Sequence, residues 1–280
     1  LLVVIDLVGV DLRYVNKEDF ISQRRLDTSF AMSQADQQIL KDTANYRVLN
    51  LNEGLNGART SYFHKSLGGY HAAKPRRLQD LFEFHVYQNN REVLNMLNAK
   101  YVIQSDAEGN PRASLNPEAL GNAWFVGELR SVSSPDEAIR ALDTLRPGRM
   151  ALINSNDFPD ISTGSFAADS TARIVMQKYQ PNELVYRTSN SGKGMAVFSE
   201  MYYPEGWQAY IDGEPQPHFR VNYALRGMVI PEGNHTVVFR FEPEVVRKGS
   251  QISLGATILL ALLLLGGAGA GLLKRKREQD

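Results

Sequence analysis

The chain has 280 residues, 43% of them hydrophobic, so it can form one or two ordinary domains with substantial cores. Lys plus Arg and Asp plus Glu both number 31, which leaves no overall positive field to attract nucleic acid, and we expect no such partner. The absence of cysteine excludes disulfides, Cys-ligated zinc and thiol nucleophiles.

Residues 1–10 are almost wholly apolar, but they are too few to cross a bilayer. They also lack the basic start and the small-residue cleavage site of a signal peptide. We interpret residues 1–12 as the outer end of a truncated preceding transmembrane helix, with Asp6 and Asp11 near its exit. The alternative is a surface strand. On the first interpretation, the chain is a fragment of a longer polytopic protein.

Residues 13–155 mix helical and strand patterns, which predicts an extracytoplasmic α/β domain. Pro75 opens a helical stretch that the polar residues 88–90 interrupt. The run from Ser134 to Glu137 predicts a capping box with proline at the first helical position, followed by a helix. Short apolar strands are predicted between the helices, at residues 47–51, 101–104, 124–129 and 150–153.

Residues 165–248 consist of successive strand patterns, separated from the first part by the turn-rich segment 154–164. Asp212-Gly213 predicts a two-residue hairpin turn, because both central positions of a type I′ turn need positive φ. Seven strands are expected, at residues 171–179, 184–188, 196–201, 207–211, 217–222, 225–230 and 235–241. That number is typical of an immunoglobulin-like sandwich.

The last apolar segment, residues 251–273, contains no charge and is followed by Lys274, Arg275, Lys276 and Arg277. A helix of this length spans the ~30 Å hydrocarbon core, and basic clusters stay on the cytoplasmic side. We therefore expect a cytoplasmic tail at 274–280 and extracytoplasmic residues before the helix. The alternative, favoured by the small residues at 266–271, is a buried core helix.

The predicted fold class is α+β. A mixed α/β domain is followed by an immunoglobulin-like antiparallel β-sandwich and by a C-terminal transmembrane helix.

The densest polar segment, residues 59–77, combines basic side chains, aromatic side chains and a Gly-Gly pair. Such a segment can bind an anionic group, for example a lipid phosphate at the membrane surface. The alternative is a structural loop whose cations pair with carbonyls and carboxylates. The candidate substrate-binding residues are His64, Lys65, His71, Lys74, Arg76 and Arg77.

Aromatic side chains are crowded around residues 204–206. Aromatic rings stack on sugars, so Tyr203, Trp207 and Tyr210 are candidate glycan-stacking residues; the alternative is core and edge packing. Catalytic motifs are lacking: the five histidines have no paired spacing for a metal, and no phosphate-binding loop or nucleophile elbow occurs. We assign no catalytic residue and no metal ligand, and an autonomous hydrolase is disfavoured.

Several motifs, in order, resemble the C-terminal extracytoplasmic region of the bacterial YfhO-type membrane protein family. Their sequences are most similar to those of members from the Bacteroidetes. The motifs lie at residues 61–74, 95–101, 121–125, 202–207, 212–213, 220–226 and 231–235.

The resemblance implies a polytopic glycosyltransferase of the GT-C architecture, which transfers sugar from a polyprenyl-phosphate carrier at the outer membrane face. It places the catalytic carboxylates before residue 1, so this fragment would hold no cofactor, and a divalent cation would belong to the full-length protein. The implied location is the bacterial cytoplasmic (inner) membrane, with a periplasmic bulk.

The expected function is that of the C-terminal module of such an enzyme. Its expected partners are the lipid bilayer, a polyprenyl-phosphate-linked sugar and cell-envelope glycan. The alternative is a non-catalytic envelope module that binds glycan or a partner protein through the β-sandwich.

Overall fold

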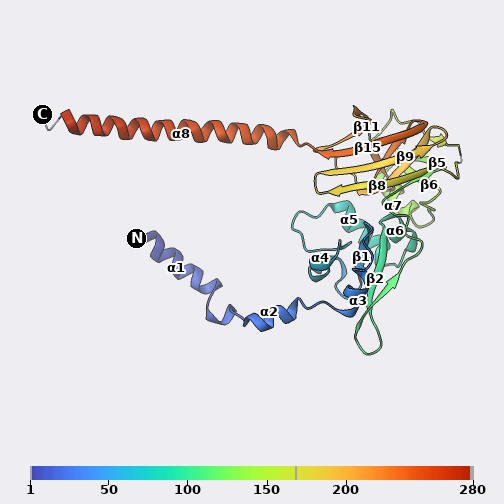
Figure 1. Ribbon diagram of the computed structural model, residues 1–280, viewed down its shortest axis with the longest axis horizontal. Helices are drawn as coiled ribbons and strands as arrows, with labels where there is room; N and C mark the ends of the chain where they lie inside the picture. The colour runs from blue at the N-terminus through green and yellow to red at the C-terminus, as the bar shows by residue number, and fades with distance from the viewer. Residues whose placement is uncertain (1, 168, 278–280) are drawn as a thin grey trace. The chain divides into compact units, whose positions relative to one another are not determined.

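The computed structural model describes residues 2–167 and 169–277, with side chains described except at residues 2, 27–29 and 268–277 (Figure 1). The chain forms two compact units, residues 1–121 and 122–280. We call them the first unit and the two-sheet unit.

The first unit is a small mixed sheet with helical segments before it and between its strands. The strands are β1 (Arg47–Asn50), β2 (Ala99–Ser105) and β3 (Pro111–Leu115). β1 pairs in parallel with β2, and β2 pairs antiparallel with β3. The helical segments are α1 (Leu2–Tyr14), η1 (Lys17–Asp19), α2 (Gln23–Ser29), α3 (Gln34–Ile39), η2 (Gly54–Asn56), α4 (Arg59–Phe63), α5 (Arg76–Leu81), η3 (Phe82–Val86) and α6 (Arg91–Met96).

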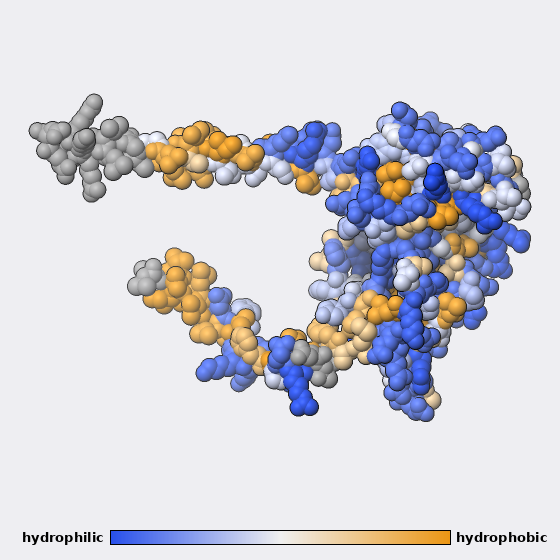
Figure 2. Space-filling view, viewed as in Figure 1, coloured by the Kyte–Doolittle hydropathy of each residue, from blue (hydrophilic) through white to orange (hydrophobic). Residues whose placement is uncertain are grey.

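The apolar start of the chain is helical, as the membrane-helix interpretation requires and unlike the strand alternative. The described apolar side chains of α1, such as Val3, Ile5 and Leu12, are exposed to solvent, and they form an orange surface in Figure 2. The core of this unit lies elsewhere. It joins Ile39 of α3 to Val48 of β1 and Ile103 of β2, all of them buried.

The helical stretch predicted after Pro75 is present and is interrupted where the polar residues occur. α5 and η3 run to Val86, and Asn89 then adopts positive φ (57°). Asn90 begins the next helix, α6, because its side-chain oxygen accepts hydrogen bonds from the backbone N–H groups of Glu92 and Val93. The break is therefore a capped helix start.

The two-sheet unit contains the predicted strands and several more. They are β4 (Ala123–Val126), β5 (Glu128–Val132), β6 (Met150–Asn154), β7 (Gly164–Ser165), β8 (Arg173–Gln180), β9 (Glu183–Asn190), β10 (Gly194–Met201), β11 (Trp207–Ile211), β12 (Glu214–Pro215), β13 (Phe219–Val221), β14 (Leu225–Ile230) and β15 (Gly233–Phe241). One sheet has the order β4-β10-β14-β13-β6-β5-β7, and the other has the order β12-β11-β15-β9-β8.

The two sheets pack together through the side chains that point inward at alternate positions along their strands. Phe198 of β10 and Met228 of β14 come from the first sheet, whereas Tyr186 of β9 and Phe239 of β15 come from the second, and all four belong to one buried cluster. The rings of Tyr186 and Phe239 each lie 4.9 Å from that of Phe198. The inner faces of the two sheets therefore share one core.

The first sheet differs from the sequence prediction near its start. The single strand expected at 124–129 is two strands, which separate at Gly127 because its N–H donates to the carbonyl oxygen of Arg149 (2.9 Å). β5 pairs in parallel with β6, and β6 pairs with β13. The compact units consequently divide at residue 121, whereas the predicted boundary lay at 154–164.

Two local predictions for the two-sheet unit can be read directly from the backbone. Asp212 and Gly213 both have positive φ (52° and 92°) and connect β11 to β12, as a type I′ turn requires. Ser134 caps α7 (Pro135–Ala141) by accepting from the N–H of Glu137 (3.1 Å). The Glu137 carboxylate, however, accepts from the N–H and hydroxyl of Ser133 instead of from Ser134, so the capping box is shifted by one residue.

The chain ends in a long helix, α8 (Glu244–Arg277). Residues Glu244–Gly267 are long and apolar enough to cross a membrane, and none of this window is buried. A buried core helix is therefore not what the described part of α8 forms, and Figure 2 shows its apolar surface in orange. The predicted basic tail at 274–280 falls on undescribed side chains, and residues 278–280 lie outside the described residues.

Candidate functional site

The candidate loop of the first unit is attached to the edge of β1. The N–H of Val48 donates to the carbonyl oxygen of Lys65 (2.9 Å), and the N–H of Leu67 donates to that of Val48 (2.8 Å). These bonds make a parallel bridge between Val48 and Ser66. The loop therefore extends the sheet by one short segment.

The Gly-Gly pair then packs against η2. A Cβ atom on Gly68 would lie 2.7 Å from the carbonyl oxygen of Gly54, which only a glycine avoids. The N–H of Gly69 donates to the carbonyl oxygen of Leu55 (2.8 Å). Lys74 completes this attachment, because its Nζ donates to the same Leu55 oxygen (3.1 Å) and to Oδ1 of Asn56 (2.8 Å). The Gly-Gly pair thus allows the backbone of the loop to lie close to the backbone of η2.

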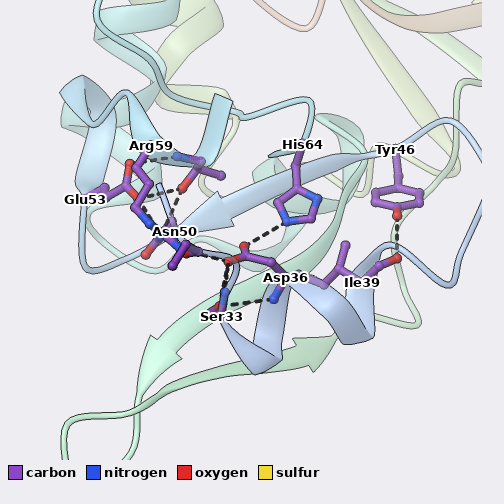
Figure 3. A network of polar contacts seen from close by, with 10 residues as sticks. Ser33, Asp36, Ile39, Tyr46, Asn50, Glu53, Arg59 and His64 are labelled. Carbon is purple, nitrogen blue, oxygen red and sulfur yellow. Dashed lines mark hydrogen bonds and ion pairs between the residues drawn. The ribbon is translucent and has the colours of Figure 1, made fainter. Parts of the chain in front are cut away.

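Behind the loop lies a buried carboxylate, Asp36, with no exposed surface (Figure 3). Its oxygens accept hydrogen bonds from the N–H (2.8 Å) and hydroxyl (2.7 Å) of Ser33 and from Arg59 (3.1 Å). His64 points at it, with Nε2 2.9 Å from Oδ1. The His64 side chain is only 2% exposed, so it faces the interior.

These contacts determine the ionisation of Asp36. Burial by itself raises the pKa of the carboxyl group, but the hydrogen bonds from Ser33, His64 and Arg59 together outweigh it. The net result is that the pKa of Asp36 lies below its ordinary value. Asp36 is therefore a charged anchor that fixes the start of the loop at His64.

A second network holds α4 beside β1 (Figure 3). The amide of Asn50 donates to Glu53 (3.0 Å) and to the hydroxyl of Thr60 (2.9 Å). Glu53 also accepts from the Thr60 hydroxyl (2.9 Å) and N–H (3.1 Å). Since Asn50 and Thr60 are buried, this network fixes the helix that leads into the loop.

The six predicted loop residues do not converge on one point. His64 is directed inward at Asp36, and Lys74 is held against η2. Lys65 is exposed and contacts Oδ1 of Asn45, and His71 is exposed and accepts from the N–H of Ala73 (3.0 Å). Arg76 and Arg77 begin α5, Arg76 exposed and Arg77 half-buried. The loop is thus partly structural and partly a cationic surface.

Sequence reasoning missed Asp36, the buried carboxylate that His64 contacts. The missed signal is the spacing of Ser33 and Asp36, which form a full capping box at the start of α3. Such a motif predicts a helix start, but it cannot show that the same carboxylate contacts His64. That contact is a property of the tertiary structure.

The three predicted stacking residues also have separate surroundings. Tyr203 is 49% exposed. Arg226 lies over the Trp207 ring, with Cζ 4.1 Å from its centroid, and the Phe241 ring lies 5.4 Å away. The hydroxyl of Tyr210 donates to Glu242 (2.8 Å), which raises the pKa of Tyr210. Trp207 therefore contributes to packing around a buried arginine.

We expect Trp207→Ala to lower the free energy of unfolding by about 2 kcal/mol, because a half-buried indole leaves both Arg226 and Phe241. Tyr203→Ala is the matched control, and its effect should stay below about 0.5 kcal/mol. Urea unfolding followed by circular dichroism measures both. Equal stability of the two variants would contradict the packing role and return Trp207 to the candidate stacking residues.

Among the described residues, no cluster of three or more His, Cys, Asp or Glu side chains that could hold a metal ion occurs. The networks around Asp36 and Glu53 instead consist of hydrogen bonds and ion pairs within the chain.

The family model described as "Bacterial membrane protein YfhO" matches residues 165–253. No curated protein matches the chain, and no solved structure matches it. The matched region runs from the end of β7 through β15 into α8 and includes strands of both sheets. Over residues 165–253, this match confirms the predicted resemblance to the YfhO family of bacterial membrane proteins.

Proposed function

We propose that the chain is the C-terminal extracytoplasmic module of a polytopic glycosyltransferase-like membrane protein, and that its loop at 64–77 contacts the phosphate of a polyprenyl-phosphate-linked sugar. The observation that carries the proposal is the contrast within this loop. Its start is anchored through His64 to a buried carboxylate, whereas Lys65, His71 and Arg76 are exposed. A rigid backbone that presents several cations is suited to an anionic headgroup.

Arg76 combines an exposed side chain with a fixed orientation. Arg76 pairs with Asp80 (2.8 Å), but its side chain is 79% exposed. The Asp80 side chain is only 10% exposed, so this buried carboxylate orients Arg76, while the exposed side of the guanidinium can donate to a phosphate oxygen. Lys65, His71, Arg76 and Arg77 would contact the phosphate, and His64 and Lys74 would position the loop.

The membrane anchor supports the location of the module. α8 provides an apolar span, and its sequence is basic from Lys274 to Arg277. By the positive-inside rule, the tail would lie in the cytoplasm and the two sheets that precede α8 would lie outside it. The proposed location is the bacterial cytoplasmic (inner) membrane, with residues 13–248 in the periplasm and the catalytic carboxylates in a preceding part of the full-length protein.

The test is sugar transfer by the full-length protein in membranes from a polyprenyl-phosphate donor pool. We expect the double variant Arg76→Gln/Arg77→Gln to lower transfer about tenfold or more, because each charge-assisted hydrogen bond contributes about 1.5–3 kcal/mol. The matched control is Lys41→Gln/Arg91→Gln, which removes two exposed charges elsewhere in the first unit.

Two outcomes would contradict the proposal. If both double variants transfer as the wild type does, the loop is structural. If the wild-type protein transfers no sugar from any polyprenyl-phosphate donor, the glycosyltransferase assignment itself is wrong. The amount of each variant in the membrane is measured in parallel, so that loss of protein is not counted as loss of activity.

A further inference from the structure

We infer that the two-sheet unit holds a second anion site, a pocket beside α7 that takes a small organic anion with an acidic head and a short apolar body. The pocket is a cavity of about 440 Å³ between α7, the turn that follows it, and the β5–β6 pair. This volume is within the ~300–1,000 Å³ of ordinary small-molecule sites. The site is separate from the loop of the first unit and does not depend on the proposed sugar transfer.

The parallel pairing of β5 and β6 sets the inner surface of the pocket. Arg130 lies opposite Leu152 in the register, and Val132 lies two residues further along β5, so these side chains share one face. Leu145, from the segment after α7, also lines the cavity. Val132, Leu145 and Leu152 are each at most 6% exposed, so they form a fixed aliphatic floor.

The rim is cationic because a tight turn brings two arginines to it. The carbonyl oxygen of Arg146 accepts from the N–H of Arg149 (2.9 Å), and both side chains line the pocket. The turn is held from outside by Trp124, whose Nε1–H donates to the carbonyl oxygen of Pro147 (2.7 Å). The N–H of Gly127 donates to the carbonyl oxygen of Arg149 (2.9 Å). The rim is therefore preorganised.

The lining carries three arginines (Arg130, Arg146 and Arg149) and two glutamates (Glu128 and Glu137), so its formal net charge is positive. Glu128 accepts from Nε and Nη2 of Arg130 (3.2 and 3.1 Å). Glu137 accepts from the N–H and hydroxyl of Ser133, and these bonds lower the pKa of its carboxyl group. A guanidinium fork at the rim is suited to the paired oxygens of a carboxylate or phosphate. The aliphatic floor is suited to the hydrocarbon part of the same molecule.

The test uses n-butyl phosphate as the probe, with inorganic phosphate and n-butanol as separate arms, added to the full chain in lipid nanodiscs. We expect saturable binding of butyl phosphate by calorimetry and weaker binding of either half alone. Arg149→Gln should raise the dissociation constant for butyl phosphate about tenfold, the effect of losing one charge-assisted hydrogen bond. Arg173→Gln, an exposed arginine of β8 in the other sheet, should leave it unchanged.

A second variant tests the apolar half of the pocket without touching its charges. Ala141→Leu adds bulk to the lining and should abolish butyl phosphate binding while inorganic phosphate still binds. Retained circular dichroism shows that each variant is folded. The inference is overturned if butyl phosphate shows no saturable binding, if Arg149→Gln and Arg173→Gln bind it equally, or if inorganic phosphate binds as tightly as butyl phosphate does.

Discussion

Asp36→Asn is expected to lower the free energy of unfolding of the first unit by about 3–5 kcal/mol, the usual effect of removing one partner from a buried charged network. The physical reason is that Asp36 is fully buried and accepts hydrogen bonds from Ser33, Arg59 and His64. An amide at this position carries no charge and directs an NH₂ group at donors. The start of the loop would then lose its anchor.

Hydrogen exchange of the amides between residues 33 and 67 measures this effect, because both tryptophans, Trp124 and Trp207, lie in the two-sheet unit and do not report on the first. Asp106→Asn is the matched control. Asp106 pairs with Arg112, whose side chain is 58% exposed, so its loss should change stability by less than about 1 kcal/mol. Similar exchange in the two variants would show that the Asp36 network contributes little.

The two-sheet unit should lose on the order of 3 kcal/mol of stability between pH 7 and pH 4 because of His218 alone. Burial of the imidazole against the rings of Tyr202 and Phe239, aided by the nearby Arg226 charge, lowers the pKa of His218 to about 4. Below its ordinary pKa of about 6.5, the unfolded chain takes up a proton that the folded chain does not. The contribution of His218 to the free energy of unfolding is therefore present at neutral pH and is lost as the pH falls toward 4.

Urea unfolding at several pH values, followed by tryptophan fluorescence, measures this dependence. His218→Phe keeps a ring of similar size but cannot titrate, so its stability should fall less between pH 7 and pH 4 than that of the wild type. An unchanged pH profile in this variant would rule out His218 as the cause.

His235→Gln is a control of opposite sign. Asp212 and the carbonyl oxygen of Glu232 accept from the two ring nitrogens of His235 and raise its pKa. The stability that this contact contributes is present below the ordinary histidine pKa and is lost as the pH rises through the raised value. His235→Gln should therefore alter the alkaline side of the pH profile of stability. The acid side, which depends on His218, should stay unchanged.

Much of the two-sheet unit could be predicted from the sequence because its signals are local. Residues 235–241 alternate strictly, and β15 covers them with Val237 and Phe239 buried. The Asp212-Gly213 turn also forms as predicted, since its requirement for positive φ depends on only two residues. The apolar run of α8 is equally local.

The candidate loop could be located from its composition, but the roles of its residues could not. His64 and Lys65 are neighbours in sequence, yet one side chain is 2% exposed and the other lies on the surface. The difference arises because the segment pairs with Val48, so successive side chains point to opposite sides. The amino-acid composition of the loop does not predict that it pairs with Val48.

The sequence by itself determined the strand positions of the second half, the helix start at Ser134, the break at residues 88–90 and the apolar C-terminal helix, because alternation, capping and hydropathy act over a few residues. Only the tertiary structure decided that β4 to β7 join the large sheet, that Asp36 contacts His64, and that Arg226 covers Trp207. Each of these depends on which distant segments pack together, and that choice is made by the free energy of the whole core.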